Sequence, residues 1–407
     1  MFLYNKLFNL FLNFIDLLLN FLYNYIVKEE IKMKYCIVTY GCQMNVHESE
    51  KIAAILEKIG YDEFTEKRDE ADIIVFNTCA IREGAEDRVF GNVGALKKLK
   101  KQRKDLIIVV CGCMTQKEET AKLFYQKFPF VDIIIGTFNL PQLEHYISAV
   151  KTGRQLDLKT EGDIDEVNPY KRTSGENAWV NIMYGCNNFC TYCIVPYVRG
   201  REKSRKKENI LNEIRGIVAE NKYKKITLLG QNVNSYGQDL EPKESFANLL
   251  KEICQIEGDF KIWFMTSHPK DLTDDVIDVI ATEDKILKDI HLPAQSGNNR
   301  ILGLMNRKYT REKYLDIINK IRTKIPNCRI TSDFIVGFPT ETEEEFEDTM
   351  SLVDTIKYDS IFAFMYSPRI GTVASKMEGQ VDEKIKNERV NKLLALEKKI
   401  QNEEGKK

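Results

Sequence analysis

The densest group of potential metal ligands in the sequence is three cysteines with C-x3-C-x2-C spacing. They are Cys186, Cys190 and Cys193, in the segment YGCNNFCTYC. Three thiolates on one short loop can bind three irons of an iron–sulfur cube, which leaves the fourth iron open to another ligand. A zinc site and unligated core cysteines are the alternatives. Zinc needs a fourth ligand, and no nearby histidine or cysteine supplies one.

Three further cysteines each follow a predicted strand in the first part of the chain. Cys42 lies in YGCQMN, Cys79 in NTCAIR and Cys113 in CGCMTQ. Parallel strands end at one edge of a sheet, so we expect these thiols to converge. This predicts a second cluster, again with one open iron. Three unrelated buried cysteines are the alternative, and Cys111 is an alternative ligand to Cys113 because it shares strand parity with it.

Two series of alternating strands and helices must position these cysteines. The first series has predicted strands at 34–40, 71–77, 105–111 and 131–136. The second has predicted strands at 178–183, 225–229, 261–266, 289–292, 329–336 and 360–366. Apolar runs separated by helices predict parallel sheets covered by helices. Six β/α units predict an open barrel. The expected fold is therefore α/β, with an N-terminal parallel-sheet three-layer domain followed by a partial (β/α)6 barrel.

Composition shifts divide the chain into residues 1–32, 33–150, 151–171 and 172–403. Residues 1–32 are apolar, with their polar side chains on one narrow helical arc. A membrane-associating helix, a helix packed on the body, and translated sequence upstream of a start at Met33 are the three interpretations. Residues 151–171 are polar and typical of a linker. A charged helix is expected at about 382–401.

Charge and cysteine content limit the function classes. The formal net charge is −1, so any RNA site must be a local patch. Ten cysteines in 407 residues are too dilute for a secreted disulfide scaffold. A reducing, cytoplasmic location is expected. Cys36, Cys254 and Cys328 lack partner motifs and are expected to be packing residues.

The C-x3-C-x2-C loop after the first strand of a six-unit barrel resembles the radical S-adenosylmethionine enzymes. Two three-cysteine sites in this order resemble their methylthiotransferase branch. The resemblance covers roughly Met33 to the end of the chain. Within that branch the chain is similar to the MiaB family in YGCQMNVHESE, NTCAIREGAEDRVFGNVG, HLPAQSGNNRILGLMNRKYTREKY, DFIVGFPTETEEEFEDT and FAFMYSPRIGTVASKM.

This resemblance implies that a methylthio group is added to carbon 2 of N(6)-isopentenyladenosine at position 37 of tRNA. It implies two 4Fe-4S clusters and S-adenosylmethionine as cofactors. The auxiliary cluster, at Cys42, Cys79 and Cys113, would carry or donate the sulfur, and one S-adenosylmethionine would methylate it. A second S-adenosylmethionine, at the other cluster, would yield a 5′-deoxyadenosyl radical. An electron donor is required, the sulfur source is unknown, and a monomer is expected.

The same resemblance places Tyr192 near the adenine of S-adenosylmethionine. Further cofactor contacts are expected in the loops that follow the barrel strands. These candidates are Gly230, Gln231, Asn232, Ser267, His268, Gln295, Ser296, Asp333 and Gly337. A basic cluster is expected to bind tRNA phosphates, with a solvated helix face as the alternative. Its candidates are Arg199, Arg201, Lys203, Arg205, Arg307 and Lys308.

Members of the MiaB family usually end in a small β-barrel RNA-binding module called TRAM. No strand pattern follows the last predicted helix, so we expect this module to be absent. The alternatives are methylthiolation of threonylcarbamoyladenosine in tRNA or of a ribosomal-protein aspartate, or a truncated, non-catalytic cluster-binding or RNA-binding remnant. The first motif, with Gln43-Met44-Asn45, differs from the GCKVN and GCPKN motifs of those two other branches.

Overall fold

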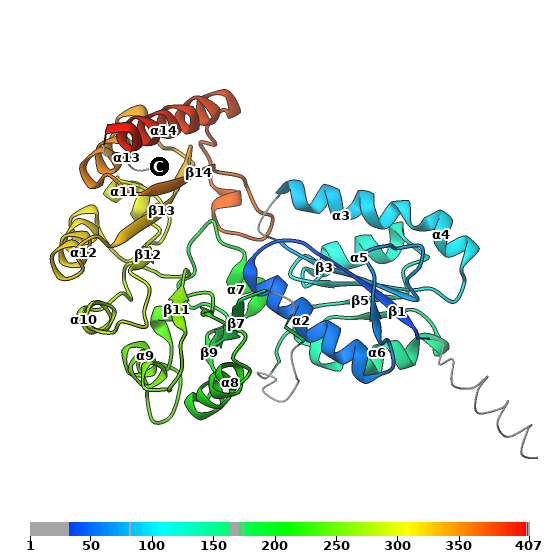
Figure 1. Cartoon of the computed structure of the whole chain (residues 1–407). Helices are drawn as coiled ribbons and strands as arrows, with labels where there is room; N and C mark the ends of the chain where they lie inside the picture. Colours follow the sequence, from blue (N-terminus) through cyan, green and yellow to red (C-terminus); the bar gives the residue numbers. More distant parts are fainter. Residues whose placement is uncertain (1–31, 81–82, 163–170, 173–174, 404, 406–407) are drawn as a thin grey trace, which may run out of the picture.

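The computed structural model describes residues 32–80, 83–162, 171–172, 175–403 and 405, which form two lobes (Figure 1). The predicted apolar helix at the start of the chain lies outside the described residues. None of the helices in the described ranges combines the length and apolar character needed to cross a bilayer.

The first lobe is built on one parallel sheet with the strand order β2-β1-β3-β4-β5-β6. Its strands are β1 (Lys34–Thr39), β2 (Glu63–Phe64), β3 (Ile73–Thr78), β4 (Ile107–Gly112), β5 (Ile133–Ile135) and β6 (Gln155–Asp157). One face carries α3 (Glu83–Ala95), α4 (Lys97–Gln102) and α5 (Glu118–Lys127), and the other carries α2 (Gln43–Lys58) and α6 (Leu143–Ala149). The predicted three-layer arrangement is confirmed.

Successive side chains of the central strands point to opposite faces of the sheet and so contribute to the two apolar cores of this lobe. Ile74 and Phe76 of β3 pack with the residues of α3 and α5. Ile73 and Val75 pack instead with α2 and α6. Both faces of the strand are apolar because both are covered by helices. This explains why the strand reads as an uninterrupted apolar run in the sequence.

Two edge strands were not predicted. The strand β2 is only two residues long, and both of its residues are exposed. The strand β6 lies inside the polar segment 151–171, which was expected to be a linker, and it pairs with β5. That expectation was wrong for residues 155–157. An edge strand buries few side chains, so its sequence lacks the alternation that reveals a strand.

The second lobe is an open barrel of six parallel strands. They are β7 (Asn177–Asn181), β10 (Lys225–Leu229), β11 (Lys261–Phe264), β12 (Asp289–His291), β13 (Arg329–Val336) and β14 (Ser360–Met365). They form two three-stranded sheets, β7-β10-β11 and β12-β13-β14, which a bridge between Ile262 and Ile286 connects. In the described part of the chain β14 pairs with β13 alone. The predicted partial barrel is confirmed.

Helices cover the outer face of this barrel (Figure 1). They are α8 (Lys207–Ala219), α9 (Phe246–Cys254), α10 (Asp274–Thr282), α12 (Arg311–Lys324) and α13 (Glu343–Ile356). The last helix, α14 (Glu383–Glu403), packs on β14 and α13. Helices and strands share one large apolar core, which leaves the loops at the carboxyl ends of the strands free for function.

The lobes meet where α7 (Val195–Arg199) of the barrel lies against the first lobe (Figure 1). The Thr137 hydroxyl donates a 2.8 Å hydrogen bond to the carbonyl of Val198. The amide of Lys171 donates to the carbonyl of Glu50 at 3.1 Å. The loop after the first barrel strand is therefore docked against the carboxyl edge of the first sheet.

Candidate active site

Cys42, Cys79 and Cys113 gather at the carboxyl edge of the first sheet. The amide of Cys113 donates to the carbonyl of Thr78 at 3.0 Å. A Cβ built on Gly41 would lie 2.6 Å from Cys79 Sγ, and the φ of Gly41 is +107°. Only glycine combines that conformation with such a close approach. The loop that carries Cys42 therefore passes directly over Cys79.

The structure separates the two alternative ligands Cys111 and Cys113. Cys111 lies in the core between the sheet and the helices α2 and α6, and its thiol faces the carbonyl of Phe76 at 3.6 Å. Cys113 packs instead against Ile194 and Val198 of the barrel lobe. Gly112, with φ +104°, provides the turn between them. Cys113 is the member of this pair that faces the junction of the lobes.

The second trio is fixed in position by a distant segment of the chain. The amide of Thr191 donates to the carbonyl of Met305 at 3.0 Å. The Asn306 amide donates to the carbonyls of Asn188 and Phe189, at 3.1 and 2.9 Å. Sequence spacing gave no sign of this clamp. These contacts fix the backbone of the loop between Cys186 and Cys193, on both sides of Cys190, whereas the amide of Cys186 donates to the carbonyl of Gly200 at 3.1 Å.

Burial raises the pKa of three of these cysteines. It is the main cause that raises the pKa of Cys113 to about 12, opposed by the positive charge of Arg199 and assisted by the negative charge of Glu48. Burial likewise raises the pKa of Cys193 to about 12 and of Cys186 to about 11. A buried thiolate needs a nearby cation, and a coordinated metal supplies it. These thiols are therefore protonated at neutral pH unless a bound cation ionises them.

Each trio also has one buried arginine beside it. Arg199 Nε donates to Cys113 Sγ at 3.2 Å, and Arg307 Nη1 lies 3.5 Å from Cys190 Sγ. Both guanidiniums are buried. The positive charge of Arg199 acts against burial on the pKa of Cys113 and so favours the thiolate form that binds iron.

The donor set of each trio suits a cluster better than a zinc ion. Three thiolates match a 4Fe-4S cube with one open iron, whereas a structural zinc ion takes four protein ligands. Across the described residues, no three His, Cys, Asp or Glu side chains are arranged to hold one metal ion.

Among the buried polar atoms without a partner in the described residues, six lie in the loops at the carboxyl ends of the barrel strands. They are Gln231 Oε1, Asn232 Oδ1, Asn234 Nδ2, Ser267 Oγ, His268 Nε2 and Gln295 Oε1. An unpaired buried polar atom costs about 1–3 kcal/mol. Such a concentration indicates a ligand that pairs with these atoms. All except Asn234 were predicted, and Asn234 lies in the same loop as Asn232.

Hydrogen bonds to nearby residues fix the orientation of two of these side chains. The Asn232 amide donates to Asp271 Oδ2 at 2.7 Å, which leaves its carbonyl oxygen to accept a hydrogen bond. The amide of Lys270 donates to His268 Nδ1 at 3.2 Å. Burial lowers the pKa of His268 to about 2, so the ring is neutral and carries its proton on Nε2. The site thus presents both acceptors and donors.

The other predicted cofactor residues have contacts within the protein. Tyr192 packs against an apolar cluster that includes Phe338 and Tyr366. Asp333 lies 3.5 Å from His291. Three of the predicted residues have contacts within the protein: Gly230 with Met183, Ser296 with Thr349 and Gly337 with Glu341.

Half of the predicted phosphate-binding cluster is buried, and that part of the prediction was wrong. Arg205 donates to the carbonyl of Asn181 and to Glu213, both at 2.7 Å. Arg199 and Arg307 are directed at the thiols described above. These three guanidiniums have partners inside the fold and are not exposed to RNA. Sequence proximity to exposed lysines made them look like one surface patch.

Arg201, Lys203 and Lys308 are exposed, as a phosphate-binding role requires. The Arg201 guanidinium lies 4.3 Å from the ring centroid of Phe189, a residue of the cysteine loop. The Phe189 ring makes an edge contact with exposed Tyr197. A cation and two aromatic rings therefore border the second trio.

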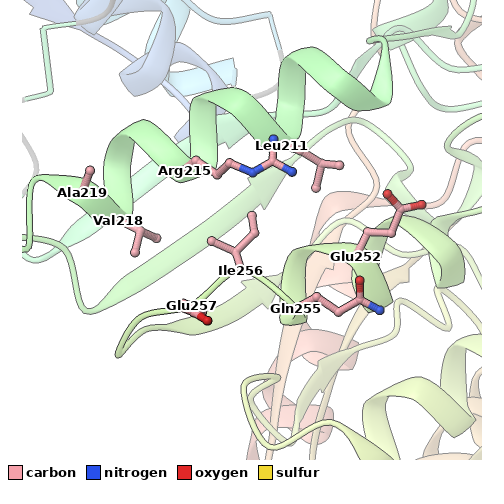
Figure 2. A pocket seen from close by; sticks show the side chains of 8 residues that line it. All are labelled: Leu211, Arg215, Val218, Ala219, Glu252, Gln255, Ile256 and Glu257. Atoms are coloured by element: carbon pink, nitrogen blue, oxygen red, sulfur yellow. The ribbon is translucent and has the colours of Figure 1, made fainter.

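Two cavities of the described residues differ in their relation to the site. A groove of about 530 Å³ runs between α8 and α9, and Figure 2 shows that Arg215, Glu252 and Gln255 border it. Its lining contains no residue of the cysteine loops. A cavity of about 290 Å³ lies between the lobes, with Tyr184 and Arg199 in its wall. Of these two, the second adjoins the candidate site.

Iron content tests the assignment of the ligands. Reconstituted anaerobically, the full chain should hold about eight irons, and Cys113→Ala or Cys190→Ala about four. Cys111→Ala is the matched control, because it removes a thiol that faces the core, and it should keep all eight. Loss of iron in Cys111→Ala with retention in Cys113→Ala would reverse the assignment.

Removal of the unpaired Ser267 hydroxyl tests whether these loops bind the cofactor. Ser267→Ala should weaken S-adenosylmethionine binding about tenfold, because a hydrogen bond of about 1.4 kcal/mol is lost. Anaerobic calorimetry measures the affinity, and the iron content should not change. Ser148→Ala removes an exposed hydroxyl from α6 and serves as the control. Equal affinities for both variants would place the cofactor elsewhere.

Comparisons with known proteins agree with this site. The model of the Radical SAM superfamily matches residues 180–353. A second model, described as Uncharacterized protein family UPF0004, matches residues 34–136. One match falls within each lobe, and each contains one cysteine trio.

Solved structures share the fold. A radical S-adenosylmethionine methyltransferase, TsrM from Kitasatospora setae, aligns with a TM-score of 0.64 at 12% identity. The alignment covers 84% of this chain and 77% of that one. At this identity the likeness concerns the fold alone.

Curated relatives are much closer in sequence. The tRNA-2-methylthio-N(6)-dimethylallyladenosine synthase of Carboxydothermus hydrogenoformans is 54% identical over 91% of this chain and 86% of the relative. A synthase of the same name from Clostridium botulinum is 55% identical over 90% of this chain and 82% of the relative. The chain therefore belongs to the tRNA-2-methylthio-N(6)-dimethylallyladenosine synthase family of radical S-adenosylmethionine enzymes.

Proposed function

We propose that this protein adds a methylthio group to carbon 2 of N(6)-isopentenyladenosine at position 37 of tRNA. Two observations support the proposal together. The relatives that share more than half of its residues are synthases of this kind. The contact between the lobes also supports it, because Cys113 of the first lobe packs against Ile194, the residue that follows Cys193 in the barrel lobe.

When bound, two 4Fe-4S clusters and S-adenosylmethionine supply the radical and sulfur chemistry, and the protein supplies binding and orientation. Cys42, Cys79 and Cys113 would hold the auxiliary cluster. The C-x3-C-x2-C loop would hold the other cluster, which would bind S-adenosylmethionine.

The barrel loops bind and orient the cofactor. S-adenosylmethionine carries an ammonium group, a carboxylate, two ribose hydroxyls and an adenine. The unpaired carbonyl oxygens of Gln231, Asn232 and Gln295 would accept hydrogen bonds from its donors, and His268 Nε2–H would donate to its acceptors. Tyr192 supplies an apolar surface for the adenine ring. Because these groups are buried, the same loops exclude water from the reactive centre.

The exposed residues beside the second trio contact the tRNA. The Phe189 and Tyr197 rings and the Arg201 guanidinium can stack on unpaired bases of the anticodon loop. Lys203 and Lys308 neutralise backbone phosphates. An external electron donor is needed. One chain carries both trios, so a monomer suffices.

Nucleoside analysis tests the proposed reaction. A strain from which the gene is deleted should lose the methylthio form of isopentenyladenosine and accumulate the unmodified isopentenyl form. The wild-type gene should restore the methylthio form. Cys190→Ala should not, and Cys254→Ala, which changes a core thiol of α9, should restore it. Mass spectrometry of digested tRNA measures both nucleosides. Unchanged nucleosides in the deletion strain would contradict the proposal.

A further inference from the structure

Arg199 belongs to the barrel lobe, but its guanidinium makes its contacts in the first lobe. It is the last residue of α7 in the barrel lobe. Its side chain extends into the first lobe, where 6% of the residue is exposed. The sequence prediction of a phosphate contact does not explain this position.

Four contacts define the environment of the guanidinium. Nη1 and Nη2 donate to the two carboxylate oxygens of Glu48, at 2.6 and 3.0 Å. Nη2 also donates to Asn45 Oδ1 at 2.9 Å. The fourth is the 3.2 Å bond from Nε to Cys113 Sγ. The two-pronged pairing with Glu48 fixes the plane of the guanidinium, and that plane directs Nε at the sulfur.

Asn45 joins this arrangement to the strands that carry the cysteines. Its amide donates to the carbonyls of Tyr40 and Thr78, both at 2.8 Å. Those residues lie just before the loops of Cys42 and Cys79. The hydrogen bonds around Arg199 therefore reach all three cysteine loops of the first lobe.

A purely structural ion pair would not need the bond to sulfur. A buried arginine–carboxylate pair contributes little net stability compared with apolar packing. Hydrogen bonds to ligand sulfurs and nearby charges, in contrast, set the reduction potential of an iron–sulfur cluster. Arg307, the counterpart beside Cys190, is held by the carbonyl of Pro293 and the hydroxyl of Tyr309 instead of a carboxylate. The charged pair is thus particular to the auxiliary trio.

We propose that Arg199 is a positioning residue which, oriented by Glu48, raises the reduction potential of the auxiliary cluster and makes that potential depend on docking of the two lobes. The inference rests on the proposed function, because it requires a cluster at Cys42, Cys79 and Cys113. One-electron reduction adds one negative charge to the cluster. The positive charge of Arg199 and its N–H bond to Cys113 stabilise that added charge, whereas Glu48 opposes it.

The potential of the auxiliary cluster can be measured without catalysis. In a full-length chain whose Cys186, Cys190 and Cys193 are changed to Ala, this is the only remaining cluster. An anaerobic titration with dithionite, followed by electron paramagnetic resonance, gives its midpoint potential. Arg199→Gln should lower the potential, and Glu48→Gln should raise it. Arg199→Lys keeps the charge without the fork and should shift the potential less than Arg199→Gln.

Opposite shifts separate electrostatic tuning from structural damage. If Arg199 and Glu48 only hold the lobes together, both substitutions should move the potential in the same direction or leave it unchanged, and either result overturns the inference. If Arg199→Gln binds no cluster, the Arg199→Lys and Glu48→Gln shifts decide by the same rule. Arg215→Gln makes the same charge change on the exposed side of α8 and should have no effect.

The proposed function fails in a distinguishable way. If the parent chain with its first-lobe cysteines intact binds no iron at all, the cluster assignment is wrong before any potential is measured. If the parent chain holds a normal cluster whose reduction potential is the same in both substituted variants, only the role of Arg199 is refuted. Iron analysis of each sample separates these outcomes.

Discussion

The site depends on a conflict between burial and charge. Iron binds thiolates, yet burial raises the pKa of Cys113 and Cys193 to about 12. The fold resolves this conflict by gathering the thiols in groups that a cluster can ionise and by placing one guanidinium beside each group. Solvent would ionise the cysteines more easily, but it would also expose reactive intermediates to quenching.

Because the thiols must be gathered in groups, the loops that carry them must approach one another closely. The positive φ angles of Gly41 and Gly112 allow the cysteine loops to turn at the end of the first sheet. In the barrel, the side-chain amide of Asn306 fixes the backbone of the second loop by donating hydrogen bonds to two of its carbonyls. Both devices act on backbone conformation, so the cysteines themselves remain free to bind iron.

The junction of the lobes is part of the chemistry rather than a passive contact. Arg199 lies close enough to Cys113 for a hydrogen bond only while α7 is docked against α2. The interlobe cavity has the same arginine in its wall. Separation of the lobes would remove the positive charge from one trio and expose that trio to solvent. Docking and the electronic state of the site are therefore linked.

Sequence reasoning succeeded where the signal is local. The C-x3-C-x2-C spacing, the apolar strands and the glycines after them predicted the observed fold and led to the proposal of both trios. It failed where a partner is distant in the chain. The burial of Arg199 and Arg205 depends on Glu48 and Glu213, which no spacing rule connects to them. Edge strand β6 and the unpaired amide of Asn234 became visible only in the folded chain.

Magnetic coupling between the clusters tests the central claim most directly, which is that the two trios face one junction. Electron paramagnetic resonance of the fully reduced wild-type chain is compared with the sum of spectra from two variants, each lacking one cluster. The account predicts that the wild-type spectrum is broadened relative to that sum, because nearby unpaired spins interact. A wild-type spectrum equal to the sum would show that the clusters lie far apart and would contradict the account.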